Sequence, residues 1–179
     1  MLVWLLSLCI RLLVPFLILF LPGLGSILGI LADMTDIVVL DTLGAPSVKL
    51  WYNQFDKLLD FYLYCFMAFQ AWKQWSNKLA KNTAVALLFF RGIGVVLFEL
   101  FPARFLLFVF PNVFVWFYLF HLFSTRVFKK DYIKNYRWLL AILVLLTLPK
   151  LYQEYLFHVV QIPLYQWFQT GLTFFTNFR

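Results

Sequence analysis

Long apolar stretches without a single charged residue dominate this sequence. Residues 12–32, 105–125 and 155–178 contain no Asp, Glu, Lys or Arg. Each stretch approaches or exceeds the roughly 20 residues with which an α-helix crosses a bilayer. Of the 179 residues, 64% are hydrophobic and 13% charged, so a soluble globule of this size would lack the polar residues to cover its surface. The pattern excludes a soluble enzyme, a disordered chain and a disulfide-stapled secreted domain, and it predicts a multi-pass integral membrane protein.

Pro, Gly and charged residues divide these stretches, and the division predicts an all-α, polytopic integral membrane helix bundle. We expect one transmembrane domain over residues 1–179, with kinks at Pro15 and Pro111. About six transmembrane helices are predicted, near residues 2–21, 23–40, 56–76, 83–101, 103–124 and 138–160. Residues 41–55 are expected to form a loop. The Phe-, Trp- and Gln-rich segment 164–178 is expected to be an interfacial helix rather than a seventh span.

The first two predicted spans differ from an ordinary signal sequence and from one long helix. No basic stretch precedes the first apolar run and Arg11 interrupts it, so we expect a retained helix rather than a cleaved signal peptide. Pro22 and Gly23 predict a tight turn between two helices, with one tilted helix over residues 2–32 as the alternative. Gly25 is one of several small residues here that allow close helix packing.

Positive charge is concentrated in two predicted loops. Lys and Arg exceed Asp and Glu by 7, and residues 124–137 form the most basic stretch. In this setting we expect the cations to meet the headgroups of a lipid bilayer and to set orientation, with no nucleic acid as partner. The number of intervening spans predicts that loops 76–82 and 124–137 share one membrane face, cytoplasmic by the positive-inside rule, and that residues 41–55 lie on the other. An oligomer is compatible with this pattern. The pattern does not indicate which membrane the protein occupies.

Acidic residues are concentrated between positions 33 and 60, which hold five of the eight. Asp33 and Asp36 are three positions apart, and Asp56 and Asp60 four, so each pair lies on one face of a helix. A carboxylate at the centre of a membrane helix costs about 2.5–3.5 kcal/mol on insertion scales, so such residues need a partner, a cavity or a function. We expect the two pairs to converge at neighbouring helix ends.

Converging carboxylates predict a divalent metal site. Hard cations such as Mg²⁺ or Mn²⁺ prefer oxygen ligands and would cancel the mutual repulsion of the acids. A carboxylate metal site at a membrane face suits chemistry on phosphates, with one carboxylate accepting a proton from the nucleophile. The alternative is that the acids are solvated at helix ends and have no common function.

Other polar residues in the apolar segments are interpreted as structural or as substrate contacts. Arg91 and Glu99 are expected to form an ion pair, with Arg91 or Arg104 as a possible phosphate contact. Lys150 and Glu154 are four positions apart and are expected to pair within one helix. His121 and His158 show no metal-ligand spacing and are expected to be satisfied or interfacial histidines rather than ligands. Cys9 and Cys65 are lone thiols in apolar surroundings, and their spacing does not determine the redox compartment.

Residues 11–62 resemble the CDP-alcohol phosphatidyltransferases, whose signature is D-x2-D-G-x2-A-R-x8-G-x3-D-x3-D. ADMTD supplies Asp33 and Asp36, and FDKLLD supplies Asp56 and Asp60, each pair with the family's spacing. The upstream run RLLVPFLILF is similar to the family's first-helix pattern of Arg, Leu and Pro. The resemblance implies six membrane helices, transfer of a CDP-activated lipid to an alcohol, and two divalent metals held by the four Asp residues. It also implies that Asp60 is the general base.

The chain departs from that signature where the nucleotide would bind. Ile37 replaces the first Gly, Leu40 and Asp41 replace Ala-Arg, and Tyr52 replaces the second Gly. The resemblance is therefore to a degenerate member of the family. A second prediction is a non-catalytic membrane scaffold, or a subunit of a larger complex, that keeps the fold without the nucleotide pocket. A small cation transporter is a third, which the lack of paired inverted halves disfavours.

Overall fold

The computed structural model of the chain describes residues 2–42, 49–101, 103 and 105–160, with side chains at 5–35, 56–101, 103, 105–156 and 159–160. All regular structure in these residues is helical, so the all-α prediction is confirmed for them. The elements are α1 (Leu2–Leu13), η1 (Val14–Phe16), α2 (Leu17–Phe20), α3 (Pro22–Thr42), α4 (Lys49–Gln74), α5 (Lys78–Leu100), α6 (Phe105–Val109), α7 (Val113–Arg126), α8 (Tyr136–Glu154) and η3 (Tyr155–Val159). The predicted interfacial helix at 164–178 lies outside the described residues.

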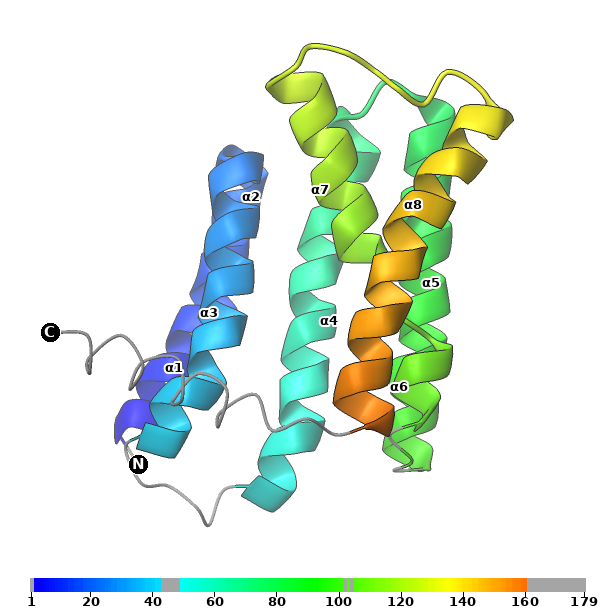
Figure 1. The fold of residues 1–179 in the computed structure, drawn as a ribbon. Coiled ribbons are helices and arrows are strands. Elements are labelled where there is room, and N and C mark those ends of the chain that lie inside the picture. Colours follow the sequence, from blue (N-terminus) through cyan, green and yellow to red (C-terminus); the bar gives the residue numbers. More distant parts are fainter. Residues whose placement is uncertain (1, 43–48, 102, 104, 161–179) are drawn as a thin grey trace, which may run out of the picture.

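The helices form a bundle with α4 at its centre (Figure 1). This helix contacts α1, α2 and α3 on one side and α5 and α7 on the other. Large and small apolar side chains from α4, α5 and α7 interlock to form most of the core. The buried members include Leu63, Met67, Ala71, Ala80, Ala84, Phe114, Phe117 and Tyr118.

The first two predicted spans form an antiparallel helical hairpin. The first is α1, η1 and α2, with Pro15 in the short 3₁₀ segment, which confirms the predicted kink. Leu21 then leaves the helical region and Pro22 opens α3, so the predicted turn is confirmed and the single long helix is wrong. A Cβ at Gly25 would lie 2.5 Å from the backbone nitrogen of Ile18, so a glycine is what allows the two helices to touch.

The predicted loop over residues 41–55 is shorter in the structure. Helix α3 extends to Thr42 and α4 already begins at Lys49, so the prediction was wrong for the seven residues before Asp56. The segment KLWYNQF contains neither Gly nor Pro, and its Asn53 lowers helix propensity by less than about 1 kcal/mol. Two other residues of the predicted loop that disfavour helix, Gly44 and Pro46, lie outside the described residues.

A side-chain cap starts α5 earlier than its apolar pattern predicted. Asn77 has an extended backbone, and its side chain accepts hydrogen bonds from the backbone N–H groups of Leu79 and Ala80. These donors belong to the first turn, where no carbonyl of the helix can accept them. The helix therefore begins at Lys78 instead of Thr83.

Asn77 also joins the α4–α5 turn to the α7–α8 loop. Its Nδ2 donates to Asp131 Oδ2 and to the carbonyl of Ile133, each at 2.7 Å. The two basic loops therefore lie at one end of the bundle, while α3 ends and α4 begins at the other end (Figure 1). The prediction that loops 76–82 and 124–137 lie together is confirmed within the bundle, and the membrane face to which each end belongs stays a prediction.

The fifth predicted span is broken at the expected place, since α6 ends at Val109 and α7 begins at Val113 beyond Pro111. Within the described residues, two segments are long and apolar enough to cross a membrane, Lys78–Leu100 and Phe105–Arg126. Only 22% of the apolar window in the first is buried inside the bundle. Large side chains are also exposed on other helices, among them Leu13, Phe20, Phe89 and Leu145. Large apolar side chains exposed on several helices favour contact with lipid or with another protein.

Candidate metal centre

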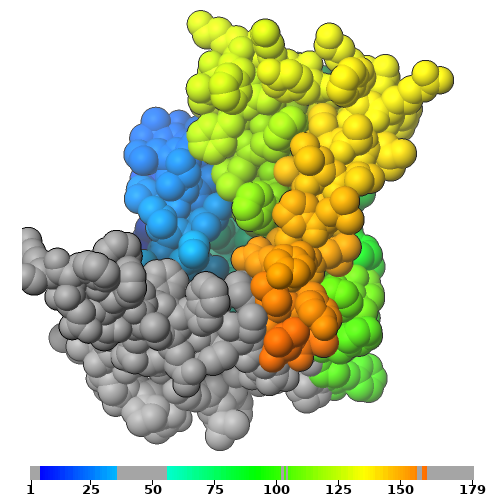
Figure 2. All heavy atoms as spheres, viewed as in Figure 1, coloured from blue at the N-terminus to red at the C-terminus, as the bar shows by residue number. Residues whose placement is uncertain are grey.

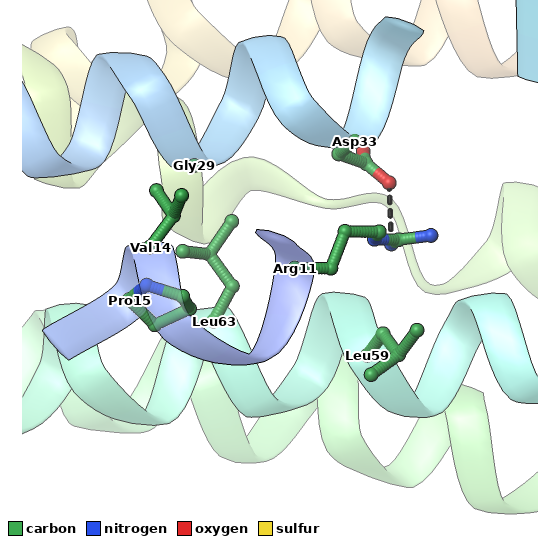
Figure 3. A pocket seen from close by; sticks show the side chains of 7 residues that line it. All are labelled: Arg11, Val14, Pro15, Gly29, Asp33, Leu59 and Leu63. Atoms are coloured by element: carbon green, nitrogen blue, oxygen red, sulfur yellow. Dashed lines mark hydrogen bonds and ion pairs between the residues drawn. The ribbon is translucent and has the colours of Figure 1, made fainter. Parts of the chain in front are cut away.

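Three carboxylates from two helices converge on the guanidinium group of Arg11 in α1. Its Nη1 donates to Asp56 Oδ1 at 2.7 Å. Its Nη2 donates to Asp33 Oδ1 at 2.6 Å and to Asp60 Oδ1 at 2.7 Å. Figure 3 shows Arg11 reaching across the space between α3 and α4 toward Asp33. The Arg11 side chain is 4% exposed, so these are buried, charge-assisted contacts.

A second cation lies at the outer side of the same cluster. Lys57 Nζ is 2.7 Å from Asp56 Oδ2 and 3.3 Å from Asp60 Oδ2. Its side chain is 22% exposed, more than that of Arg11. Among these five described groups, three formal negative charges therefore face two positive charges, and one negative charge remains in excess.

Helix geometry and one small residue bring the acids together. Asp56 and Asp60 are one turn apart on α4, as their spacing predicted. Gly29 precedes Asp33 by one turn on α3, and a Cβ there would lie 2.6 Å from Leu63 Cδ1 on α4. The glycine allows α3 to approach α4 closely enough for Asp33 to reach the same guanidinium group as the α4 acids.

The arrangement fits a divalent cation by its donor set. One ligand oxygen from each of Asp33, Asp56 and Asp60 lies within 4.8 Å of the others, so these residues could hold a metal ion. The predicted convergence is confirmed for these three acids, and the side chain of Asp36 lies outside the described residues. Oxygen ligands suit Mg²⁺ or Mn²⁺. Arg11 and Lys57 contact oxygens of the same carboxylates, so a metal must compete with both cations.

A small cavity of about 10 Å³ adjoins the cluster. Arg11 and Asp33 form its polar wall, and Gly29, Leu59 and Leu63 are among the residues on its other sides (Figure 3). This is at most about the space of one water molecule, and a nucleotide is far larger. In this conformation the cluster is a closed ion-pair network rather than an open substrate pocket.

Arg91 does not join the acidic cluster. Arg91 lies on α5 and is 4% exposed. Its Nη1 donates a hydrogen bond at 2.7 Å to the carbonyl oxygen of Phe110, which follows the end of α6. The expected ion pair with Glu99 is not found in the described residues, where Oε1 of Glu99 is also buried without a hydrogen-bond partner. The carbonyls freed by the break at Pro111 explain the difference, since they attract the guanidinium group. Arg104 lies outside the described residues.

A second buried polar cluster joins α4, α7 and α8. Asn112 Nδ2 donates to Tyr64 Oη at 2.6 Å, and the backbone N–H of Asn112 donates to Glu154 Oε1 at 3.5 Å. Glu154 also pairs with Lys150 at 3.0 Å, which confirms the predicted pair within α8. Interhelical hydrogen bonds of this kind stabilise helix bundles in lipid. No spacing of these residues in the chain predicts this cluster.

The isolated His and Cys residues hold no common site in the described part of the chain. His121 is 2% exposed and packs against Trp75, with ring centroids 4.2 Å apart. Its Nδ1 lies 3.9 Å from Asp131 Oδ1. Cys9 and Cys65 are free thiols. In the described residues His121 Nδ1 has no hydrogen-bond partner, and the side chain of His158 lies outside them, so the interpretation of the two histidines stays a prediction.

The sequence interpretation missed the two cations of the acidic cluster. Arg11 was noted as an interruption of an apolar run and as part of the RLLVPFLILF pattern, but not as a partner of the acids. Lys57 lies inside the FDKLLD segment itself. A charged side chain in a membrane helix needs a partner, and that rule applied to Arg11 would have indicated the acids.

Comparisons with family models, with curated proteins and with solved structures return no significant match to this chain.

Proposed function

We propose that the chain is a multi-pass integral membrane protein with about six spans and the two basic loops on the cytoplasmic side. The exposed apolar helices and the placement of both basic loops at one end support this. In a background without Cys9 and Cys65, cysteines at Asn77 and Lys130 should react with an impermeant maleimide from one side. A cysteine at Ser47 should react from the other side. Equal labelling of all three from the same side would contradict the proposal.

We further propose that the protein is a degenerate relative of the CDP-alcohol phosphatidyltransferases that acts on a CDP-activated lipid. The convergence of Asp33, Asp56 and Asp60 from separate helices is the observation that carries this proposal. These residues, with Asp36, would hold Mg²⁺ or Mn²⁺. When bound, the cation would neutralise the diphosphate of the lipid and stabilise the departing phosphate.

The chain's own side chains would perform the remaining tasks. Asp60 would accept the proton of the attacking alcohol, since a carboxylate next to the reacting centre is a suitable general base. Lys57 is next to Asp60 on the more exposed side of the cluster and would hold it in place. Arg11 would keep the carboxylates together before the cation binds, because it contacts all three.

A non-catalytic scaffold or complex subunit is the second candidate, and one observation favours it. Arg11 and Lys57 already neutralise most of the acidic charge, and the adjoining cavity of about 10 Å³ has no room for a nucleotide. In that reading the two cations replace the metals, and the cluster only joins α1 to α3 and α4.

Mn²⁺ binding by purified protein, with and without CDP, separates the two candidates. A transferase should bind Mn²⁺ by electron paramagnetic resonance titration, bind it more tightly with CDP, and form lipid product from a CDP-activated lipid and an alcohol. Asp60→Asn should abolish product and keep much of the Mn²⁺ binding, since three carboxylates remain. Glu99→Gln, which changes an acid on α5 outside the cluster, is the matched control and should change neither. If the protein bound no Mn²⁺ and formed no lipid product, the transferase proposal would be contradicted and the scaffold candidate would be favoured.

A further inference from the structure

One end of the bundle carries the entire net charge of the protein. We call it the cationic end and define it as residues 72–81 and 126–138. Eight Lys and Arg residues and a single acid, Asp131, lie in it, a difference that equals the formal net charge of +7 for the whole chain. The cations are Lys73, Lys78, Lys81, Arg126, Lys129, Lys130, Lys134 and Arg137. The α7–α8 loop forms the outermost part of this end in Figure 2.

These cations have little internal compensation. Asp131 accepts hydrogen bonds from Asn77 Nδ2 and from the backbone N–H of Ile133, so its carboxylate is directed into the loop. In the described residues, none of the eight cations forms an ion pair with an acid. All but Lys81 are classed as exposed. The positive field of this end is therefore directed outward.

The loops that carry the cations are held in a defined shape. Asn77 joins the two loops, and Ile133 is 2% exposed and anchors the longer one in the core. The backbone N–H of Lys130 donates to the carbonyl of Ser124 at 3.0 Å. Asn135 caps α8 by accepting from the backbone N–H of Trp138. These contacts therefore hold the lysines of the loop in defined positions.

Large aromatic and apolar side chains are exposed beside the cations. Phe128, Tyr136 and Trp138 are 65%, 77% and 57% exposed. Lys81 Nζ lies 5.3 Å from the ring centroid of Trp72, which is itself exposed. Aromatic rings next to Lys and Arg are typical of the boundary between hydrocarbon and headgroups, and clustered cations select anionic lipids there. Exposed rings beside cations also occur where single-stranded nucleic acids bind, so the membrane location of the proposed function is what selects lipid here.

We propose that the cationic end is a binding surface for anionic phospholipid headgroups, assembled by the Asn77 bridge between the two loops. The inference uses the membrane location from the proposed function but not the acidic cluster, so either can fail alone. A cation near a charged leaflet adds roughly fivefold to partitioning, and this contribution is screened by salt.

Spin-labelled phosphatidylglycerol and phosphatidylcholine test the surface in vesicles that contain the full-length protein. At low ionic strength, the wild-type protein should prefer phosphatidylglycerol by roughly fivefold or more, and high salt should bring the ratio toward one. The triple variant Lys129→Gln, Lys130→Gln and Lys134→Gln should lose most of the preference. The matched triple change of the same lysines to Arg should keep it, because the charge is unchanged.

Asn77→Ala provides a readout that a simple count of charges would not move. It removes no charge but removes the hydrogen bonds that join the two loops. The preference for phosphatidylglycerol should therefore fall by about half or more, while its salt dependence persists. A preference that is absent in the wild type, or equal in the Gln and Arg triple variants, overturns the proposal. Retention of a short RNA by the detergent-solubilised protein at physiological salt, without any lipid preference, would likewise overturn it in favour of nucleic acid.

Discussion

The substitution Arg11→Gln tests the acidic cluster most directly. It removes the cation that contacts Asp33, Asp56 and Asp60 and leaves these three carboxylates with Lys57 as their cationic partner among the described residues. Removing one partner of a buried ion pair costs about 3–5 kcal/mol, because the remaining charge stays desolvated. Asp33 is 31% exposed and can recover some hydration, so we expect a loss near the lower limit, about 3 kcal/mol. Glutamine preserves helix propensity, so the loss reports the charge.

Lys57→Gln is the matched control for Arg11→Gln. It also removes one cation from the cluster, but its side chain is 22% exposed against 4% for Arg11. Its ion pairs resemble those at a protein surface, so we expect Lys57→Gln to lower the free energy of unfolding by about 1 kcal/mol or less. Arg11→Lys should be intermediate, since an ammonium group cannot present the guanidinium fork to three acids.

Unfolding in detergent, followed with and without Mg²⁺, measures both the cost and its rescue. Without a divalent cation, Arg11→Gln should unfold far more readily than Lys57→Gln. At a hundredfold excess over its dissociation constant for the variant, Mg²⁺ should stabilise Arg11→Gln by about 2.7 kcal/mol. It should stabilise the wild type less, because Arg11 competes for the carboxylates there. A loss below about 1 kcal/mol for Arg11→Gln would refute the energetic argument. Equal stabilisation of variant and wild type by Mg²⁺ would refute the competition.

Two further pairs of variants test the packing and the loops by the same unfolding assay. Gly25→Ala should destabilise the protein by about 1–3 kcal/mol because its Cβ would overlap the α2 backbone, whereas Gly23→Ala meets nothing within 4 Å and should be neutral or slightly stabilising. Asn77→Ala should cost about 2 kcal/mol, since it loses both a helix cap and the bridge between loops. Asn135→Ala, which loses only an exposed cap, should cost about 1 kcal/mol or less. Equal losses within either pair would contradict the assigned contacts.

The breaks between helices followed from local sequence, whereas the starts of α4 and α5 did not. Pro22 and Pro111 act on their own backbone, so the turn and the kink could be predicted without knowledge of the neighbours. The start of α5 depends on the Asn77 cap. The predicted span began instead at the first residue of the uncharged stretch that follows Lys81. The hydrogen-bond partner of Arg91 was not predictable, because it is a carbonyl group exposed by the break between α6 and α7.

The acidic cluster could have been predicted more fully from chain geometry. Arg11 and Asp33 are each 11 positions from Pro22, where the antiparallel hairpin of α1, α2 and α3 turns, so they lie at the same height along the bundle. Asp56 and Asp60 in turn bracket the position that mirrors Asp33 across the connection between α3 and α4. All four side chains therefore belong to one level of three adjacent helices, where an unpaired cation and unpaired acids would each be costly. The spacing of the acids alone indicated a metal, but the position of Arg11 at that level makes the protein's own cation the first competitor for it.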